Sequence, residues 1–398
     1  MPNIERLSRR ALLKQSLMFP VSVSIGNHLL AGHVASANNK SLQFEPVEKI
    51  LREAVNQNAF PGCAAAFGNC QSILWNSGFG HLSLSSQNKV TTSTIYDLAS
   101  LTKVVGTTSV AIQLITKQAL SLDDLVVKWI PEFRAKDETE PAARRQITIR
   151  HLLTHSSGLP SWKPIYKSVS NYRETIQAIC DTKLEQPPGE KYRYSDLGMM
   201  LLGEVLSRAG KSTLAELESD LVFKPLKMNQ TLRNPPQSLW NKIAPTERIG
   251  ESETFYQGVV HDENARGGEG LTGHAGLFSN IINLSKYCQA WLRATRGEDS
   301  VFDTDLARQF ASRQKIPGDT GRGLGWQMFS SGGSGGTLLS ESAFGHTGFT
   351  GTSLWVDPEL DLFLILLSNR VHPTLKNSRH IAVRRQFADA VVRAVQQS

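Results

Sequence analysis

The segments with a β-strand pattern lie near the two ends of the chain, and helical patterns fill the part between them. Near the N-terminus, apolar runs at residues 62–67 and 73–79 flank the turn-forming residues 68–71, which is the signal of a hairpin. Three further strand-like segments lie near the C-terminus, at residues 324–329, 353–356 and 360–368. We therefore expect one sheet assembled from both ends of the chain, with helices packed beside it.

Helical spacing of apolar residues recurs along the whole chain. It is found at residues 47–56, 100–118, 171–180, 197–209, 213–222, 284–295 and 379–395, with a shorter helix within 146–160. The 398 residues are 40% hydrophobic and 20% charged, so the chain can bury a substantial core. The expected fold class is α+β, with a mainly helical middle.

The first residues have the order of a secretory signal peptide. Arg9 and Arg10 lie in a basic region, which is followed by a mildly apolar run at residues 16–31 and by small residues at 35–37. The arginine pair is typical of the twin-arginine route, so we expect cleavage after Ala37 and a periplasmic or secreted protein. A disordered basic tail or a short membrane anchor is the alternative, although the apolar run is too short and polar to span a bilayer.

Removal of this leader changes the charge of the chain. The leader holds four basic residues and one acidic residue, so the net charge falls from +7 to about +4 in residues 38–398. This charge gives little reason to expect nucleic acid as a partner. The mature chain also contains four scattered cysteines whose spacing matches no zinc-binding pattern, namely Cys63, Cys70, Cys180 and Cys288. We expect buried free thiols, with one disulfide bridge as the alternative.

Ser100 and Lys103 form a Ser-x-x-Lys pattern at the start of a predicted helix. Residues i and i+3 share a helical face, with Cβ atoms roughly 5–6 Å apart, so the hydroxyl and the amine can share a hydrogen bond. A serine becomes a nucleophile when a neighbouring group takes its proton, and a helix N-terminus can stabilise an oxyanion. The spacing alone proves little, because residues 86–89 and 312–315 also have it. An ordinary serine in the first helical turn is the alternative.

Two other segments carry candidate catalytic side chains. Tyr194 and Asp196 precede the predicted helix at 197–209, and a tyrosine held beside a lysine can act as a general base. The alternative is that Asp196 caps the helix and Tyr194 packs beneath it. In the glycine-rich segment 345–352, His346 could bind a substrate carboxylate or move protons, and a surface turn is the alternative.

Three further patterns resemble catalytic motifs but lack the required context. Residues 332–336 fit G-x-S-x-G without a strand-to-helix elbow around the serine. His151 and His155 have the spacing of a zinc protease, but Leu152 stands where the glutamate is needed. Residues 210–212 resemble the end of a phosphate loop whose first glycine is absent.

The candidate segments become specific through their order. Ser-x-x-Lys at Ser100, Tyr-x-Asp at Tyr194 and His-Thr-Gly at His346 resemble, in order and spacing, the serine β-lactamase and penicillin-binding protein superfamily. The resemblance covers residues 44–394 and is closest to class C β-lactamases, DD-carboxypeptidases and related esterases. Two further segments support it, residues 149–160 and 273–279.

The resemblance implies a β-lactamase/transpeptidase-like fold, in which an antiparallel sheet flanked by helices lies beside a mainly helical lobe. The sheet lobe would comprise residues of about 42–105 and 275–398, and the helical lobe about 106–274, with the cleft between them. The resemblance implies no metal and no organic cofactor.

Roles for individual residues also follow from the resemblance. Ser100 would form an acyl-enzyme, and Lys103 and Tyr194 would move the proton. The N–H groups of Ser100 and Phe349 would form the oxyanion hole. The residues implied to bind substrate are Asp196, His346, Thr347, Gly348 and Phe349.

Two positions depart from the β-lactamase pattern. Asp196 stands where those enzymes usually have an asparagine that reads the acylamino group of the substrate. His346 replaces the usual lysine, as it also does in DD-carboxypeptidases. An acid at Asp196 could bind an amine or repel an acylamide carbonyl, so efficient β-lactamase activity is less expected than the fold suggests.

The sequence thus predicts an exported serine hydrolase that cleaves an amide or ester through an acyl-enzyme. The expected substrate is a small molecule or a peptidoglycan peptide, with a D-alanyl peptide as the leading candidate. A β-lactamase, an esterase or a non-catalytic penicillin-binding or sensing protein is the alternative. The oligomeric state and the role of residues 261–264 stay open.

Overall fold

The computed structural model describes residues 44–134, 141–318 and 321–397. The predicted signal peptide at 1–37 lies outside these residues. The described residues belong to one unit that begins at Phe44. Among them, no helix combines the length and the apolar character needed to cross a membrane.

The predicted sheet from both ends of the chain is confirmed. It has six strands in the order β2-β1-β9-β8-β7-β6, and all neighbouring strands are antiparallel. The strands are β1 (Gly62–Gly68), β2 (Ile73–Gly80), β6 (Gln327–Met328), β7 (Phe344–Thr347), β8 (Ser353–Asp357) and β9 (Leu362–Ser368). In the centre of the sheet, β1 from the start of the domain pairs with β9 from its end, from Cys63 opposite Ser368 to Gly68 opposite Phe363.

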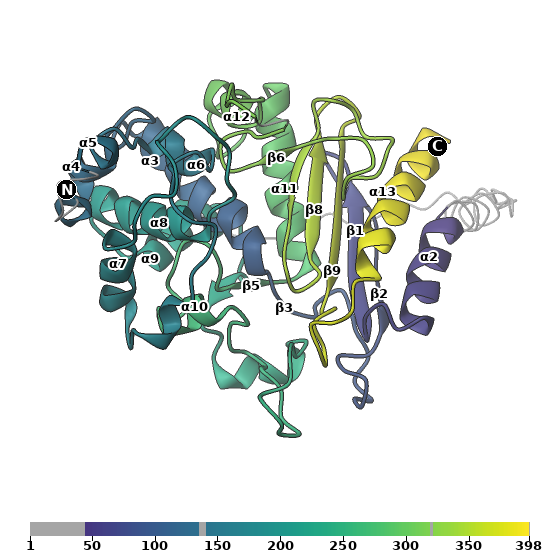
Figure 1. Ribbon diagram of the computed structural model, residues 1–398. Helices are drawn as coiled ribbons and strands as arrows, with labels where there is room; N and C mark the ends of the chain where they lie inside the picture. Colours follow the sequence, from purple (N-terminus) through teal and green to yellow (C-terminus); the bar gives the residue numbers. More distant parts are fainter. Residues whose placement is uncertain (1–43, 135–140, 319–320, 398) are drawn as a thin grey trace, which may run out of the picture. The chain divides into compact units, whose positions relative to one another are not determined.

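Helices cover both faces of this sheet, which explains why its central strands are apolar throughout. Helices α2 (Glu45–Asn56) and α13 (His380–Gln396) pack on one face, and α11 (Ile281–Arg296) packs on the other (Figure 1). Successive side chains of β1 alternate between the faces, so Ala65 contributes to the core under α2 and α13, whereas Ala64 contributes to the core under α11.

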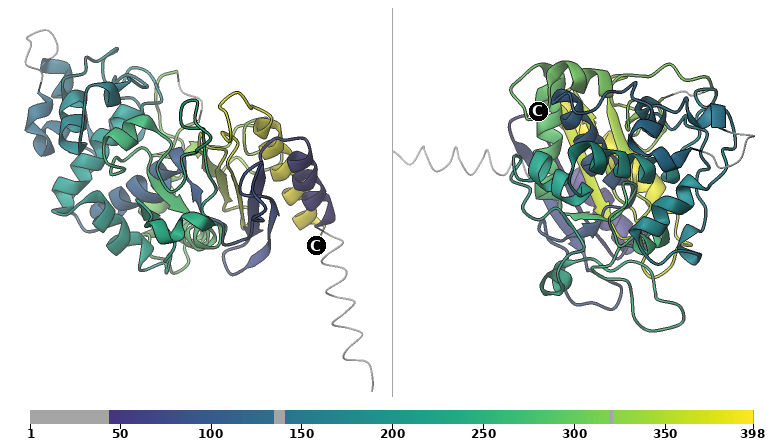
Figure 2. Two further views of the ribbon diagram at one scale, coloured as in Figure 1. Left: turned by 90° about the horizontal axis from the view of Figure 1, so that it is seen from below. Right: turned by 90° about the vertical axis from the view of Figure 1, so that its left-hand side faces the viewer.

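The helical part of the chain gathers beside the sheet around α8 (Asp196–Gly210), most of whose residues are buried (Figure 2). Its other α-helices are α3 (Ser109–Thr116), α4 (Val126–Trp129), α5 (Pro141–Arg144), α6 (Ile149–Leu153), α7 (Tyr172–Cys180), α9 (Leu214–Glu218) and α10 (Glu263–Gly267). Helix α12 (Thr304–Phe310) packs against α11. Five of the predicted helices therefore form close to their expected bounds, at 47–56, 171–180, 197–209, 284–295 and 379–395.

A small second sheet was not predicted. Its order is β3-β5-β4, with β3 (Tyr96–Asp97), β5 (Leu277–Ser279) and β4 (Leu232–Arg233). Strands of two or three residues carry too little periodicity to be recognised from sequence. This sheet fixes the chain just before Ser100 against the segment that follows His274.

Several expected elements differ from those observed. The predicted helix at 100–118 is a 3₁₀ turn at Ala99–Leu101, a π-helical stretch at Lys103–Thr108 and then α3, which ends at Thr116. The strand predicted at 324–329 is limited to β6, because Leu324 and Trp326 are buried in the core rather than paired in the sheet. The glycine-rich segment at 345–352 was expected only to precede a strand, but its first residues belong to β7.

Candidate active site

Ser100 lies in a tight turn at the start of the helix that leads into α3. Ala99, the residue before it, has a φ of +46°, a left-handed conformation that a residue with a Cβ rarely adopts. The turn is held because the Asp97 carboxylate accepts a hydrogen bond from the Ala99 N–H at 2.8 Å. On the far side, Thr350 donates to the Asp97 carbonyl and Thr352 to the Leu98 carbonyl. The turn between β7 and β8 thus fixes a strained backbone directly before the candidate nucleophile.

Lys103 is fully buried and contacts Ser100 one helical turn away. Its Nζ donates to Ser100 Oγ and to the His274 carbonyl oxygen, both at 3.0 Å, and forms an ion pair with Asp196 Oδ1 at 2.7 Å. Burial alone disfavours the charged amine, but the Asp196 carboxylate and Tyr194 outweigh burial, so the pKa of Lys103 is raised above its usual value. Lys103 is therefore a cation beside Ser100, and a cation stabilises negative charge there but cannot accept a proton.

Tyr194 lies beside this pair and is held by aromatic neighbours. Lys103 Nζ is 5.1 Å from the centre of its ring, and the ring of His155 is 4.6 Å away, centre to centre. His155 is buried and its Nδ1 accepts the backbone N–H of Ser195 at 3.1 Å, so it fixes the backbone next to Tyr194. Since Lys103 is protonated, Tyr194 is the remaining candidate for accepting the Ser100 proton.

Asp196 is the first residue of α8, but it does not cap the helix. Ser195 is the N-cap, and its Oγ accepts the N–H of Gly198 at 3.0 Å. The suggested structural role for Asp196 as a cap is therefore wrong. Its carboxylate points to Lys103 instead, and its side chain is 18% exposed.

His346 and Thr347 come from β7 and line the same cavity as Ser100. Burial, with the positive charges of Arg322 and Lys103, lowers the pKa of His346 to about 3, so the ring is neutral. Its Nδ1–H donates to the Thr347 carbonyl oxygen at 2.8 Å, which leaves Nε2 as an acceptor. Within the described residues, Nε2 has no hydrogen-bond partner.

Gly348 and Phe349, which follow Thr347 in the chain, also line this cavity. A Cβ on Gly348 would lie 2.1 Å from Thr352 Oγ1 and 2.4 Å from the Leu98 carbonyl oxygen, so only glycine fits this close approach. Phe349 is 54% exposed, and its ring stacks on His261 with the Arg370 guanidinium 4.3 Å from its centre.

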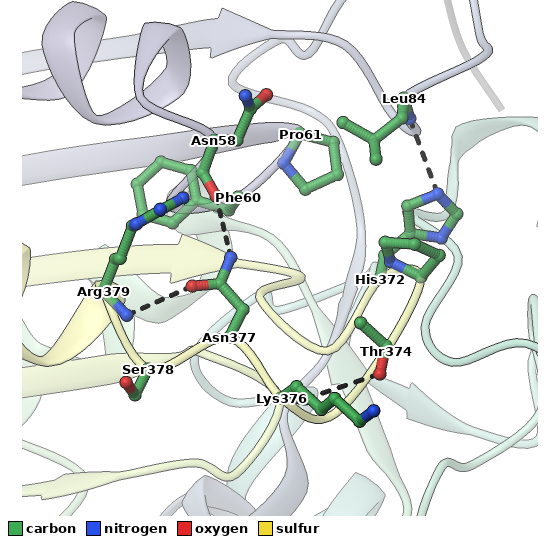
Figure 3. A pocket seen from close by; sticks show the side chains of 11 residues that line it. Asn58, Phe60, Pro61, Leu84, His372, Thr374, Lys376, Asn377, Ser378 and Arg379 are labelled. Carbon is green, nitrogen blue, oxygen red and sulfur yellow. Dashed lines mark hydrogen bonds between the residues drawn. The ribbon is translucent and has the colours of Figure 1, made fainter.

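The cavity beside Ser100 has a volume of ≈ 410 Å³ and brings Ser100, Tyr194 and four predicted binding residues, from His346 to Phe349, to one place. Its lining also contains three arginines and no acidic residue: Arg322, Arg370 and Arg384. A neighbouring cavity of ≈ 500 Å³ shares Asn377 and Ser378 with it (Figure 3). In that second cavity the Asn377 side chain is taken up by hydrogen bonds with the backbone of Asn58 and Arg379. Its lining contains the hydroxyls of Thr374 and Ser378 and the lysine Lys376, but no tyrosine.

Four residues that sequence reasoning did not single out belong to this site. Asp262 and His274 lie behind Lys103, where His274 Nε2 is 2.8 Å from Asp262 Oδ1. Both fell within segments noted in the sequence, 261–264 and 273–279, but without a role. His155 was considered for metal spacing and lay within the supporting segment 149–160, but without a role, and Arg322 had no local motif.

Ligand atoms of Asp196, Asp262 and His274 lie within 4.8 Å of one another, an arrangement that could hold a metal ion. The ammonium of Lys103, 2.7 Å from Asp196, already supplies the positive charge that these carboxylates require. The same carboxylates would otherwise repel each other in a half-buried place.

The fold and the site define a serine hydrolase. A hydroxyl beside a buried lysine ammonium, with a tyrosine to take its proton, is suited to nucleophilic attack on a carbonyl carbon and to formation of an acyl-enzyme. The comparison with protein families identifies the particular group: the model of the Beta-lactamase family matches residues 47–388, and this chain belongs to that family.

Relatives agree with this assignment. An Escherichia coli O157:H7 protein with the name "Putative D-alanyl-D-alanine carboxypeptidase" is 32% identical over 323 residues, which cover 74% of this chain and 73% of that protein. Among solved structures, EstCE1, "a hydrolase with promiscuous acyltransferase activity", has a TM-score of 0.73 at 18% identity and covers 89% of this chain and 99% of its own. The octameric penicillin-binding protein homologue from Pyrococcus abyssi has a TM-score of 0.69 at 21% identity, and the match covers 87% of this chain and 76% of the homologue. The predicted fold is therefore confirmed.

Proposed function

We propose that this protein is a carboxypeptidase that removes a C-terminal D-alanine through an acyl-enzyme on Ser100. The observation that carries this proposal is the cavity beside Ser100, whose lining is basic and contains no acidic residue. Arg322 Nη1 is buried there without a hydrogen-bond partner in the described residues. A guanidinium of this kind suits a free carboxylate, which an ester or a neutral amide would not provide.

The residues of the site have distinct tasks in this reaction. Ser100 Oγ attacks the peptide carbonyl carbon, and its proton passes to Tyr194, which acts as the phenolate and becomes a neutral phenol. Lys103 stays protonated and stabilises the negative charge that develops on these oxygens. The carbon–nitrogen bond then breaks, and Tyr194 returns the proton to the departing amine of D-alanine. Water then attacks the ester carbonyl carbon while Tyr194 takes its proton, and Tyr194 returns that proton to Ser100 Oγ as the ester bond breaks and the shortened peptide leaves.

The D-alanyl peptide is favoured because the E. coli relative carries that name, and because His346 keeps a free acceptor, Nε2, in the cavity. The leader sequence supports export by the twin-arginine route to the periplasm or the medium. Replacement of Arg9 and Arg10 by lysine should retain the protein in the cytoplasm, which cell fractionation would measure. Unchanged export of that variant would refute the route.

The activity is tested by release of D-alanine from peptides that end in D-alanyl-D-alanine, both with a free and with an acylated N-terminus. The wild-type protein should release D-alanine, and Ser100→Ala should not, although its thermal stability is unchanged. Intact mass after exposure to a penicillin should show an adduct that Ser100→Ala lacks. Wild-type release of D-alanine by Ser100→Ala would overturn the proposal, and rapid consumption of the penicillin without D-alanine release would indicate a β-lactamase instead.

A further inference from the structure

The charged side chains around Ser100 fall into two sets, one acidic and one basic. Asp196 and Asp262 lie on the side of Lys103, where ligand atoms of these two carboxylates and of His274 come within 4.8 Å of one another. The arginines belong to the lining of the cavity beside Ser100, where the Arg322 guanidinium is 5.5 Å from the centre of the Tyr194 ring. A substrate bound at Ser100 therefore has acidic groups beside Lys103 and basic groups in the cavity lining as binding partners.

The carboxylate of Asp196 retains unused hydrogen-bonding capacity. A carboxylate offers about four acceptor positions, and among the described residues Asp196 has one polar contact, the ion pair with Lys103. Asp262 differs, because its Oδ1 already accepts the N–H of Ala265 and contacts His274 Nε2, both at 2.8 Å. Asp196 is thus the partly exposed acceptor that a positively charged group could reach.

The position of Asp196 relative to Ser100 matches an α-ammonium group. The contacts of Lys103 with Ser100 Oγ at 3.0 Å and with Asp196 Oδ1 at 2.7 Å share one nitrogen, so the two oxygens lie at most about 6 Å apart. In an aminoacyl group, standard bond lengths place the α-nitrogen about 2.5 Å from the carbonyl carbon. An ammonium next to the carbon that Ser100 attacks can therefore contact Asp196. An N-acyl group would instead bring a carbonyl oxygen towards a carboxylate.

The arginines of the cavity lining supply the matching site for the carboxylate end of the substrate. Arg384 and Arg370 donate to backbone carbonyl groups, including those of Gly348 and Phe349. Arg322 differs from them, because its Nη1 has no hydrogen-bond partner in the described residues. His346, which is 3% exposed, also keeps Nε2 unpartnered in this cavity and can accept an N–H of the substrate.

We propose that the preferred substrate is a zwitterionic dipeptide, whose free α-ammonium group binds Asp196 near Asp262 and whose C-terminal carboxylate binds Arg322. This inference rests on the proposed carboxypeptidase function and narrows its substrate class. Asp196 and Ser100 both contact Lys103, so the ammonium end of the dipeptide, which is its acyl part, is the end bound near the nucleophile. The enzyme then acts on free dipeptides rather than on acylated cell-wall peptides.

Asp196 has a second role to be separated from this one, because it also holds Lys103 in place. Loss of that positioning would slow hydrolysis of every substrate equally, since Lys103 acts at the shared nucleophile. Loss of an ammonium contact would slow only substrates that carry the ammonium. The ratio of kcat/KM values for two matched substrates therefore distinguishes the roles.

The experiment compares D-alanyl-D-alanine with N-acetyl-D-alanyl-D-alanine. The wild-type protein should have the higher kcat/KM on the free dipeptide, by about tenfold or more for a hydrogen-bonded charged group. Asp196→Asn should reduce that ratio by a similar factor. Asp262→Asn should reduce the ratio of kcat/KM values by less, and its asparagine can still cap α10, so the fold is retained. An equal or higher wild-type kcat/KM on the acetylated dipeptide would overturn the inference and leave the carboxypeptidase function standing.

A pH series on the wild-type protein gives a test without any variant. An α-amino group loses its proton near pH 8, so the preference for the free dipeptide should decline above that pH. A constant preference between pH 7 and about pH 9 would overturn the ammonium contact, as would a proportional loss on both substrates in Asp196→Asn. Failure to cleave either dipeptide, together with failure on longer D-alanyl peptides, would reject the proposed function itself.

Discussion

A buried ion pair between Glu218 and Arg233 holds the segment that carries His274, and its contribution to the free energy of unfolding can be tested. The side chains are 0% and 3% exposed, and the contact is bidentate, with distances of 2.7 and 2.8 Å. Arg233 Nη1 also donates to three carbonyl groups in the segment that carries His274, those of Gly270, Thr272 and Ala275. Glu218→Gln keeps the shape of the side chain but leaves the guanidinium buried without a counter-charge.

The expected decrease in the free energy of unfolding of Glu218→Gln is large because the Arg233 charge stays buried away from water. Removal of one partner from a buried pair costs about 3–5 kcal/mol. For a unit of roughly 350 residues, the entropy of unfolding is about 0.7 kcal/mol/K at the midpoint, so this loss lowers Tm by about 4–7 °C. The exposed pair of Asp220 and Lys224, with side chains 61% and 73% exposed, provides the control. Asp220→Asn should cost less than about 1 kcal/mol.

Differential scanning calorimetry of the wild-type protein, Glu218→Gln and Asp220→Asn would measure both effects under the same conditions. A Tm for Glu218→Gln within about 1 °C of the wild-type value would refute the reasoning, because the predicted shift is several times larger. An equal shift in both variants would show that burial does not decide the energy of these pairs.

Three further predictions concern the cleft, its titration and the thiols. Gly348→Ala should lower Tm and kcat together, because the new methyl group displaces Thr352 or the Leu98 carbonyl; thermal melts and D-alanine release would measure this, and unchanged values of both would contradict the clash. The pKa of His346 is lowered to about 3 in the folded protein, so the unfolded state binds more protons between about pH 6.5 and pH 3 and stability falls as the pH is lowered through that range. His346→Gln should reduce this fall in urea titrations at pH 7 and pH 4, and an unaltered difference between the two pH values would exclude His346 as a contributor. The four cysteines are all free and buried, namely Cys63, Cys70, Cys180 and Cys288, and burial raises the pKa of the Cys70 thiol to about 11. Iodoacetamide at pH 8 should therefore modify these thiols only after the protein unfolds. Rapid labelling of the native protein would contradict their burial.

The sequence predicted the elements whose periodicity is long and regular. Helix α7 and the hairpin of β1 and β2 formed nearly as expected, since their apolar spacing and turn residues act locally. The expected free thiols are also confirmed. Elements decided by tertiary contacts were missed. The strand-like run at 324–329 is apolar because Trp326 fills the core, and its spacing resembles that of a strand.

The structure brings the predicted site residues together, and their catalytic roles stay predictions. Ser100 and Lys103 are neighbours on one helix, so their contact followed from spacing alone. Asp262 and His274 could not be placed, because they reach Lys103 through a fold contact across more than 150 residues of chain. Arg322 is isolated in sequence from every motif, and only the cavity relates it to Ser100.

The pairing of β1 with β9 has a consequence for the way this chain is made. Cys63 lies opposite Ser368, so during synthesis β1 cannot pair with β9 until about three hundred further residues have been made. Helices α2 and α13, which cover that face, are likewise contributed by opposite ends. A chain halted before residue 362 would expose the apolar edge of β1, and late termination products should aggregate even though every predicted site residue from Ser100 to Phe349 is present.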